Sequence, residues 1–267
     1  MPDDPGPDGD ELLVEVTDGV GRLTINRPER RNAMSWSVLT GMREQLAAWK
    51  HDPGVRVVVL TGSGDKAFCA GADLTGMAGD AGALELHESR GELARLFHDL
   101  WDLGKPTVAR VRGYCLAGGF GLALSCDLVV ASTAARFGIP EVKRSLVAAG
   151  GGLWRLPRKL PINLAMELTL TGDPIEPERA YHFGLVNELC EPGEALDRAF
   201  ALAERIAANA PLAVRESRRI LMQYEDLGLD ECVNQSNAAI MTLGSTADFS
   251  EGLMAFIEKR APEWKGR

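Results

Sequence analysis

Residues 113–127, GYCLAGGFGLALSCD, decide how the chain folds. Three glycines, Gly118, Gly119 and Gly121, fall within four positions at the point where an apolar helix should begin. A glycine inside a helix costs about 1 kcal/mol relative to alanine. Bare backbone here therefore needs a reason, which is either close packing or a ligand that approaches the first N–H groups of the helix.

The composition excludes several classes of function. The 267 residues are 45% hydrophobic and 25% charged, which suits a large core in one or two domains. A net charge of −9 argues against a nucleic-acid partner, and the lack of a run of about 18 apolar residues predicts no membrane span. Residues 1–10 are acidic and proline-rich and predict a disordered tail rather than a signal peptide. Five cysteines without a CxxC pair predict reduced thiols and a cytoplasmic protein.

Strands and helices alternate along the first part of the chain. Residues 12–26 predict a β-hairpin around DGVG, and apolar residues at helical spacing over 35–49 precede a β-branched strand at 53–62. A second strand–helix–strand unit follows, with a strand at 105–114, a helix at 118–126 and a strand at 128–132. From about residue 161 the pattern becomes helical, which predicts a helical C-terminal third.

Two glycine-containing turns could meet at one point. A helix that begins at Gly118 leaves its first N–H groups without internal partners, at the positive end of the helix dipole. Residues 66–74, KAFCAGADL, form a second turn after a buried strand. Two such turns could direct two N–H groups at one thioester enolate or tetrahedral oxyanion. Each turn could instead serve packing or hold a phosphate, although neither GxxxxGK[ST] nor a well-matched GxGxxG motif is present.

Several motifs occur in an order that is more specific than any one of them: AFCAGADL, GYCLAGGFGLALSCDLVVAS, ARFGIPEV, LTG at 170–172, AYHFGLVNEL and EGLMAFIEKRAPEWK. From about residue 11 to the end, the chain resembles the enoyl-CoA hydratase/isomerase (crotonase) superfamily. The resemblance implies the α/β crotonase (ClpP-like) fold of stacked ββα units with a helical C-terminal trimerisation region. It implies a core over 11–195 that holds the CoA and active sites, and an oligomerisation region over 196–267.

The resemblance also implies site residues. The backbone N–H groups of Ala72 and Gly118 would hold the thioester oxygen of an acyl-CoA, and Glu141 would be the catalytic acid or base. No metal and no separate cofactor is implied, because coenzyme A is part of the substrate. The protein would be a homotrimer or a hexamer, with Phe256 and Lys259 reaching a neighbour's CoA site. The other substrate- and CoA-binding candidates are Arg27, Ala33, Lys66, Ala70, Asp73, Leu74 and Gly119, of which Asp73 could equally be structural.

Gly121 departs from the pattern, because similar hydratases carry a second glutamate at this position. Two carboxylates usually orient the water and share the protons in hydration of an enoyl thioester. A single carboxylate can still move a proton from C4 to C2 of a 3-enoyl thioester, so an enzyme that is only a Δ3-Δ2-enoyl-CoA isomerase is one alternative. Dienoyl-CoA isomerase is disfavoured by Ala149, where an aspartate is expected. The other alternative is a non-catalytic acyl-CoA-binding or scaffolding relative.

Other polar side chains offer weaker candidates. Residues 75–104 predict a helix beside the acyl chain, and its acids and histidines could enter the pocket: Glu85, His87, Glu88, Glu92, His98 and Asp99. Ser125 or Cys115 could act as a nucleophile only with a histidine that the sequence does not place. Asp127 is expected to cap or pack at the end of the 118–126 helix.

Overall fold

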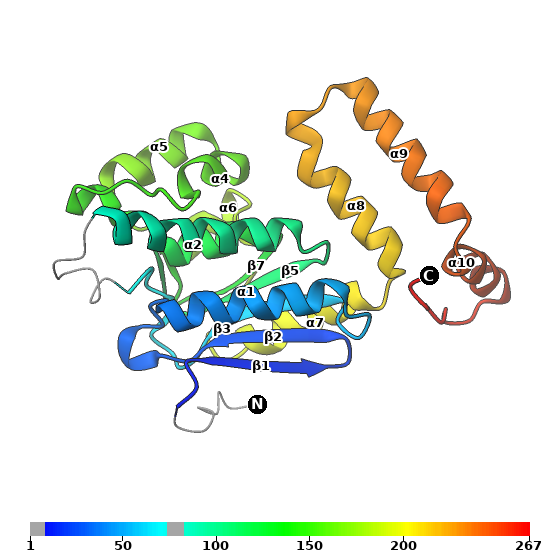
Figure 1. The fold of residues 1–267 in the computed structure, drawn as a ribbon, viewed down its shortest axis with the longest axis horizontal. Coiled ribbons are helices and arrows are strands. Elements are labelled where there is room, and N and C mark those ends of the chain that lie inside the picture. Colours follow the sequence, from blue (N-terminus) through cyan, green and yellow to red (C-terminus); the bar gives the residue numbers. More distant parts are fainter. Residues whose placement is uncertain (1–8, 74–82) are drawn as a thin grey trace.

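The strands form two β-sheets, and Figure 1 labels β1, β2, β3, β5 and β7 of the larger one. The computed structural model describes residues 9–73 and 83–267, and for residues 83–90 the backbone alone. Six strands form one sheet in the order β1-β2-β3-β5-β7-β9, and three form a second sheet in the order β4-β6-β8. The strands of the larger sheet are Leu12–Thr17 (β1), Val20–Ile25 (β2), Val57–Gly62 (β3), Thr107–Val111 (β5), Leu128–Ser132 (β7) and Glu188–Cys190 (β9).

The predicted hairpin is confirmed. β1 and β2 pair antiparallel around Asp18 and Gly19, whose φ angles of 49° and 82° are those of a tight hairpin turn. From β2 onward the larger sheet is parallel. Its inner strands β3 and β5 are buried along their whole length, and most of their residues are apolar.

The predicted strand at 105–114 is in fact two strands in different sheets. β5 ends at Val111, the chain turns at Gly113 with a φ of 68°, and β6 runs from Tyr114 to Leu116 in the smaller sheet. A Cβ on Gly113 would lie less than 3.0 Å from the carbonyl oxygen of Lys66, so the turn needs glycine. The other strands of the smaller sheet are Ala67–Cys69 (β4) and Arg136–Gly138 (β8), and all three are parallel.

Helices cover both sides of the larger sheet. One side packs on a core shared with Trp36–His51 (α1), Ala83–Asp102 (α2), Gly118–Ser125 (α3), Gly152–Lys159 (α4), Ile162–Thr171 (α5) and Pro177–His182 (α6). On the other side, Ala195–Ala207 (α7) lays three alanines against the valines of β2, β3, β5 and β7. The predicted helix at 35–49 is confirmed, with Ser35 as its N-cap. The three-residue strand β9 lies in the region predicted to be helical and was missed.

The last three helices extend away from the sheets (Figure 1). They are Pro211–Gln223 (α8), Leu229–Gly244 (α9) and Ala247–Glu258 (α10). Large apolar side chains on them are exposed, among them Leu229 at 79%, Met241 at 77% and Phe256 at 85%. The C-terminal tail ties α10 back, because the Asp248 carboxylate accepts hydrogen bonds from the Lys265 and Gly266 N–H groups. The boundary at residue 195 and the oligomerisation role of the region beyond it stay predictions.

Candidate active site

The three strands of the smaller sheet bring the three predicted catalytic positions to one edge. Ala72 follows β4 by three residues, Gly118 follows β6 by two, and Glu141 follows β8 by three. Because the strands are parallel, their carboxyl ends meet at the same edge, where ligands of α/β sheets commonly bind. The Ala117 N–H donates to the Gly138 carbonyl at 2.9 Å, which ties the start of α3 to the segment that carries Glu141.

Ala72 and Gly118 lie against each other at this edge. A Cβ on Gly118 would lie 3.5 Å from the Ala72 nitrogen, and a Cβ on Gly71 would lie 3.3 Å from the Gly118 nitrogen. Two hydrogen bonds to Met34 fix this turn. The Met34 N–H donates to the Gly71 carbonyl at 2.8 Å, and the Asp73 N–H donates to the Met34 carbonyl at 2.9 Å. Neither bond uses the Ala72 N–H, which lies between these two groups along the chain. Within residues 9–73 and 83–267, the structure shows no acceptor for the Ala72 N–H. Gly118 opens α3, where an N–H has no intrahelical acceptor.

Gly118, Gly119 and Gly121 at the start of α3 have different surroundings, which explain differently why each is a glycine. A Cβ on Gly119 would lie less than 3.0 Å from the carbonyl oxygen of Cys69, so Gly119 allows α3 to pack on β4. A Cβ on Gly121 would lie 2.8 Å from the Phe97 ring. Only at Gly118 does the bare backbone face the other predicted donor, Ala72. Contacts with backbone or with a buried ring therefore explain Gly119 and Gly121. At Gly118 the nearest atom is Leu93 Cδ2 at 3.1 Å, the end of a flexible side chain, and a ligand at the bare backbone stays a prediction.

Ala117, which caps α3, has an unfavourable backbone conformation. Its φ of 52° and ψ of −126° lie in a region that a residue with a Cβ rarely adopts. Such a conformation costs on the order of 1–3 kcal/mol and persists where the surrounding structure imposes it. It turns the chain from β6 into α3 and so directs the Gly118 N–H.

Glu141 supplies a carboxyl group that is partly buried and has a raised pKa. It lies in the 3-10 helix Pro140–Arg144 (η3), and its Oε2 is buried without a hydrogen-bond partner in the described structure. Burial raises the pKa of Glu141 from its ordinary value of 4.5, against the smaller opposing effects of its own backbone N–H and of Arg144. A carboxyl group whose pKa moves toward neutrality, with a free oxygen, is suited to accept and return a proton.

Comparisons with known proteins decide the family. Residues 15–267 match the family model described as enoyl-CoA hydratase/isomerase. The chain belongs to the enoyl-CoA hydratase/isomerase family. It is 37% identical over 256 residues to the (E)-benzylidenesuccinyl-CoA hydratase of Thauera aromatica, covering 96% of this chain and 99% of that protein.

Solved structures confirm the crotonase fold. The enoyl-CoA hydratase of Bacillus anthracis superposes with a TM-score of 0.94 at 32% identity, over 97% of this chain and 100% of that one. The enoyl-CoA hydratase of Mycobacterium tuberculosis H37Rv gives a TM-score of 0.85 at 43% identity, over 96% of this chain and 99% of that one. The chain is therefore an enoyl-CoA hydratase/isomerase family enzyme of acyl-CoA metabolism.

Three of the predicted CoA-binding residues of this family member lie together. The Arg27 guanidinium donates to the Ala33 carbonyl at 2.7 Å and pairs with the carboxylates of Glu11 at 2.7 Å and Asp73 at 2.9 Å. These contacts brace the loop after β2 against the turn that holds Ala72. Arg27, Ala33 and Asp73 therefore have a structural role, and direct contact with CoA stays a prediction for each of them.

The remaining CoA candidates are spread more widely. Lys66 is exposed and lines a cavity of about 260 Å³ with the loop after β2, and the Ala70 N–H donates to the Arg31 carbonyl at 3.1 Å. Leu74 lies outside the described residues. Phe256 and Lys259 lie at the end of the projecting helix α10, and their contact with a neighbour's site stays a prediction.

Among the weaker candidates whose side chains the structure describes, the acids of α2 are held in ion pairs. Arg43 pairs with both Glu92 and Asp99, and His98 is exposed. The side chains of Glu85, His87 and Glu88 lie outside the described residues. Burial raises the pKa of the Cys115 thiol well above its ordinary value of 9.0, so it is a poor nucleophile.

Ser125 and Asp127 have structural roles. The Ser125 hydroxyl donates to the Gly121 carbonyl at 2.8 Å, within its own helix. The Asp127 carboxylate accepts hydrogen bonds from Thr107 and from Arg218, which confirms its predicted role in packing.

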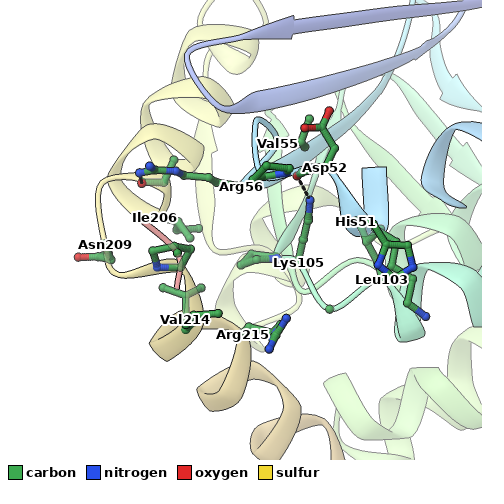
Figure 2. A pocket seen from close by; sticks show the side chains of 18 of the residues that line it. His51, Asp52, Val55, Arg56, Leu103, Lys105, Ile206, Asn209, Val214 and Arg215 are labelled. Carbon is green, nitrogen blue, oxygen red and sulfur yellow. Dashed lines mark hydrogen bonds between the residues drawn. The ribbon is translucent and has the colours of Figure 1, made fainter. Parts of the chain in front are cut away.

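Another cavity lies away from the predicted catalytic residues (Figure 2). Its volume is about 350 Å³, and it lies between the ends of α1 and α7 and the start of α8. Figure 2 shows Lys105 bonded to Asp52 there, with Arg56 and Arg215 nearby. Its lining includes none of Ala72, Gly118 and Glu141.

The described residues meet the requirements of neither a metal site nor a membrane-spanning helix. In that part of the chain, no three His, Cys, Asp or Glu side chains lie together in a way that could hold a metal ion. None of the described helices is long and apolar enough to cross a membrane. The absence of a metal and of a separate cofactor stays a prediction.

Sequence reasoning missed two side chains at the site. Leu93 and Phe97 of α2 contact the positions of Gly118 and Gly121. In the sequence they follow the apolar spacing of any buried helix, which carries no sign of a functional contact.

Proposed function

We propose that this enzyme adds water to the double bond of a 2-enoyl-CoA thioester, with Glu141 as its single acid and base. The observation that carries the proposal is the buried Oε2 of Glu141, which has no partner in the described structure and stands at the same sheet edge as Ala72 and Gly118. A buried polar atom without a partner costs free energy, and a carboxyl group in that state whose pKa is raised is suited to proton transfer.

The proposed reaction uses one proton twice. The thioester oxygen accepts hydrogen bonds from the N–H groups of Ala72 and Gly118. The Glu141 carboxylate takes a proton from water as the water oxygen bonds to C3, and the π electrons of the double bond move to form the enolate. The Glu141 carboxyl group then returns the proton to C2, so that one water is added and the enzyme is restored.

The rate contributions that are typical of an oxyanion donor and of an acid–base group indicate how much catalysis this site can supply. An oxyanion donor typically contributes on the order of 10²–10³ in rate. A positioned acid–base group contributes on the order of 10²–10⁴. Both contributions are supported here by backbone placement and by one carboxyl group, so a second glutamate at position 121 is not required for substantial catalysis.

The alternatives gain less support. The relatives described above are named as hydratases, which favours neither an enzyme that only isomerises nor a non-catalytic acyl-CoA-binding protein. The same carboxyl group could move a proton between C4 and C2, so isomerisation of a 3-enoyl-CoA is an expected side activity.

Two further properties belong to the proposal. The exposed apolar side chains of α9 and α10 support assembly into a homotrimer or a hexamer, which light scattering of the purified protein would measure. The five cysteines are free, which supports a cytoplasmic location.

Glu141→Gln tests the proposal. We expect wild type to hydrate 2-enoyl-CoA, with loss of thioester conjugation and a product heavier by one water. Glu141→Gln should lose at least 10²-fold in kcat/KM because the amide cannot accept the proton. Glu178→Gln, on the exposed surface of α6, is the matched control. Full activity of Glu141→Gln would refute the proposal, and isomerisation without hydration would move it to the alternative.

A further inference from the structure

We infer that Phe97 is a specificity-determining residue, because its ring fills the place beside Gly121 where a second acid would stand. This inference rests on the proposed function. It also names the substrate class: the ring selects acyl groups that are unbranched at C3.

The contact follows from how two helices pack. Gly118 and Gly121 are three residues apart and share one face of α3, while Leu93 and Phe97 are four residues apart and share one face of α2. A Cβ on Gly118 would lie 3.1 Å from Leu93 Cδ2, and a Cβ on Gly121 would lie 2.8 Å from Phe97 Cε2. The two faces therefore meet in register, with Phe97 one turn beyond the predicted oxyanion donor.

Phe97 is buried and closely packed. Its side chain is 1% exposed, and a Cβ on Gly150 would lie 3.1 Å from the same ring carbon that faces Gly121. The Arg155 guanidinium, which is itself buried, stands 5.5 Å from the ring centre. A buried ring whose edge packs against two glycines, with a cation near its centre, cannot move aside at little cost.

The position of Gly121 relative to the thioester gives the inference its chemistry. Three residues of α-helix advance about 4.5 Å along the axis. A thioester whose oxygen is bound at Gly118 and whose chain runs along α3 places C3 near this next turn. The Phe97 ring then contacts C3 and leaves no room there for a methyl branch or a carboxylate.

The first test is ligand binding, which needs no turnover. We expect wild type to bind butyryl-CoA more tightly than 3-methylbutyryl-CoA, and Phe97→Ala to reduce this preference about tenfold, the usual scale for one methyl group in a fitted pocket. Leu96→Ala removes a buried side chain from the same helix and is the control, so its preference should match wild type. Titration calorimetry measures both ligands on all three proteins. An unchanged preference in Phe97→Ala, or an equal change in Leu96→Ala, would overturn the inference.

The second test couples the two positions. Gly121→Glu should lower the Tm because its Cβ meets the ring, and Phe97→Ala in the same chain should recover part of that loss. The Phe97→Ala, Gly121→Glu double variant should have a ratio of hydration to isomerisation about tenfold above that of the Phe97→Ala, Gly121→Ala double variant. Only the variant with glutamate at position 121 adds an acid. Gly121→Glu with a wild-type Tm, or two strictly additive Tm changes, would refute the steric exclusion. An unchanged reaction ratio in a folded double variant would refute the chemical role.

The two tests separate this inference from the proposed function. Saturated acyl-CoA binding and the Tm coupling do not depend on Glu141. If Glu141→Gln keeps full activity, the proposed function fails while both readouts on Phe97 remain valid.

Discussion

Gly118→Ala separates the chemistry of the glycine turn from its packing. The added methyl group would lie 3.5 Å from the Ala72 nitrogen, in the gap between the two predicted donors. An oxygen that accepts from both N–H groups must approach each nitrogen to about 2.7–3.2 Å. The methyl group crowds that approach, so we expect kcat/KM to fall about 10²–10³-fold, as on removal of an oxyanion donor, which is about 2.7–4 kcal/mol of transition-state stabilisation.

The same substitution should leave the fold intact. Its other contacts, at 3.1 and 3.4 Å, are with Leu93 Cδ2 and Met34 Cε, which are ends of flexible side chains. Gly119→Ala is the matched control, because its methyl group would overlap the Cys69 carbonyl, which is backbone and cannot yield. We therefore expect Gly118→Ala to be folded and nearly inactive, and Gly119→Ala to have a much lower Tm.

Steady-state kinetics on 2-enoyl-CoA and thermal unfolding by circular dichroism measure the two effects on the same preparations. A folded Gly118→Ala variant that keeps more than a third of wild-type kcat/KM would refute the assignment of the Gly118 N–H. A Gly119→Ala variant as stable as wild type would refute the packing argument for the neighbouring glycine.

Three further outcomes follow from single residues. Ala117→Gly should raise the free energy of unfolding by about 1 kcal/mol, because glycine adopts a φ of 52° without strain; a lower value in denaturant unfolding would contradict this. Because the folded-state pKa of Glu141 is raised above 4.5, stability contributed by this group is greatest below pH 4.5 and is lost as pH rises toward the raised pKa. Glu141→Gln has no carboxyl group to ionise and so avoids this loss of stability at high pH. Its Tm should therefore exceed that of wild type by more at pH 7 than at pH 4, and an equal difference at the two pH values would contradict the raised pKa of Glu141. Asp127→Ala leaves Arg218 without its carboxylate partner and should cost about 3–5 kcal/mol in chemical denaturation; a loss below 1 kcal/mol would show that the pair is dispensable.

Local sequence patterns predicted the elements whose formation is itself local. The hairpin at 12–26 has alternating apolar residues and an Asp-Gly turn, and the helix at 35–49 has a serine cap with apolar spacing. The strand β9 has only three residues and no pattern of its own. It forms because the chain returns beside β7, where the Asn187 N–H donates to the Val129 carbonyl at 2.8 Å. Such a long-range pairing leaves no periodic signal in the sequence.

The division between β5 and β6 was missed for a related reason. Residues 105–114 read as one apolar strand, whereas the turn at Gly113 depends on the carbonyl of Lys66 from a distant part of the chain. The order of motifs predicted which backbone positions would form the site. It could not predict that Phe97 would fill the space beside Gly121, because a phenylalanine in an amphipathic helix is ordinarily a core residue.

The location of the site can be argued from cost alone, without reference to any relative. Three unfavourable features lie at the carboxyl edge of the three-stranded sheet: the left-handed backbone of Ala117, the buried Oε2 of Glu141, and the Ala72 N–H, which has no acceptor in the described structure. They come from segments that follow three different strands, so no single local sequence imposes them together. A folded chain retains clustered strain and unsatisfied polar groups chiefly where they meet a ligand. A thioester bound at this edge would give the Ala72 N–H an acceptor and would place its reacting carbons near Glu141, while the Ala117 conformation directs the Gly118 N–H. This account requires acyl-CoA binding to raise the Tm of wild type more than that of Gly118→Ala.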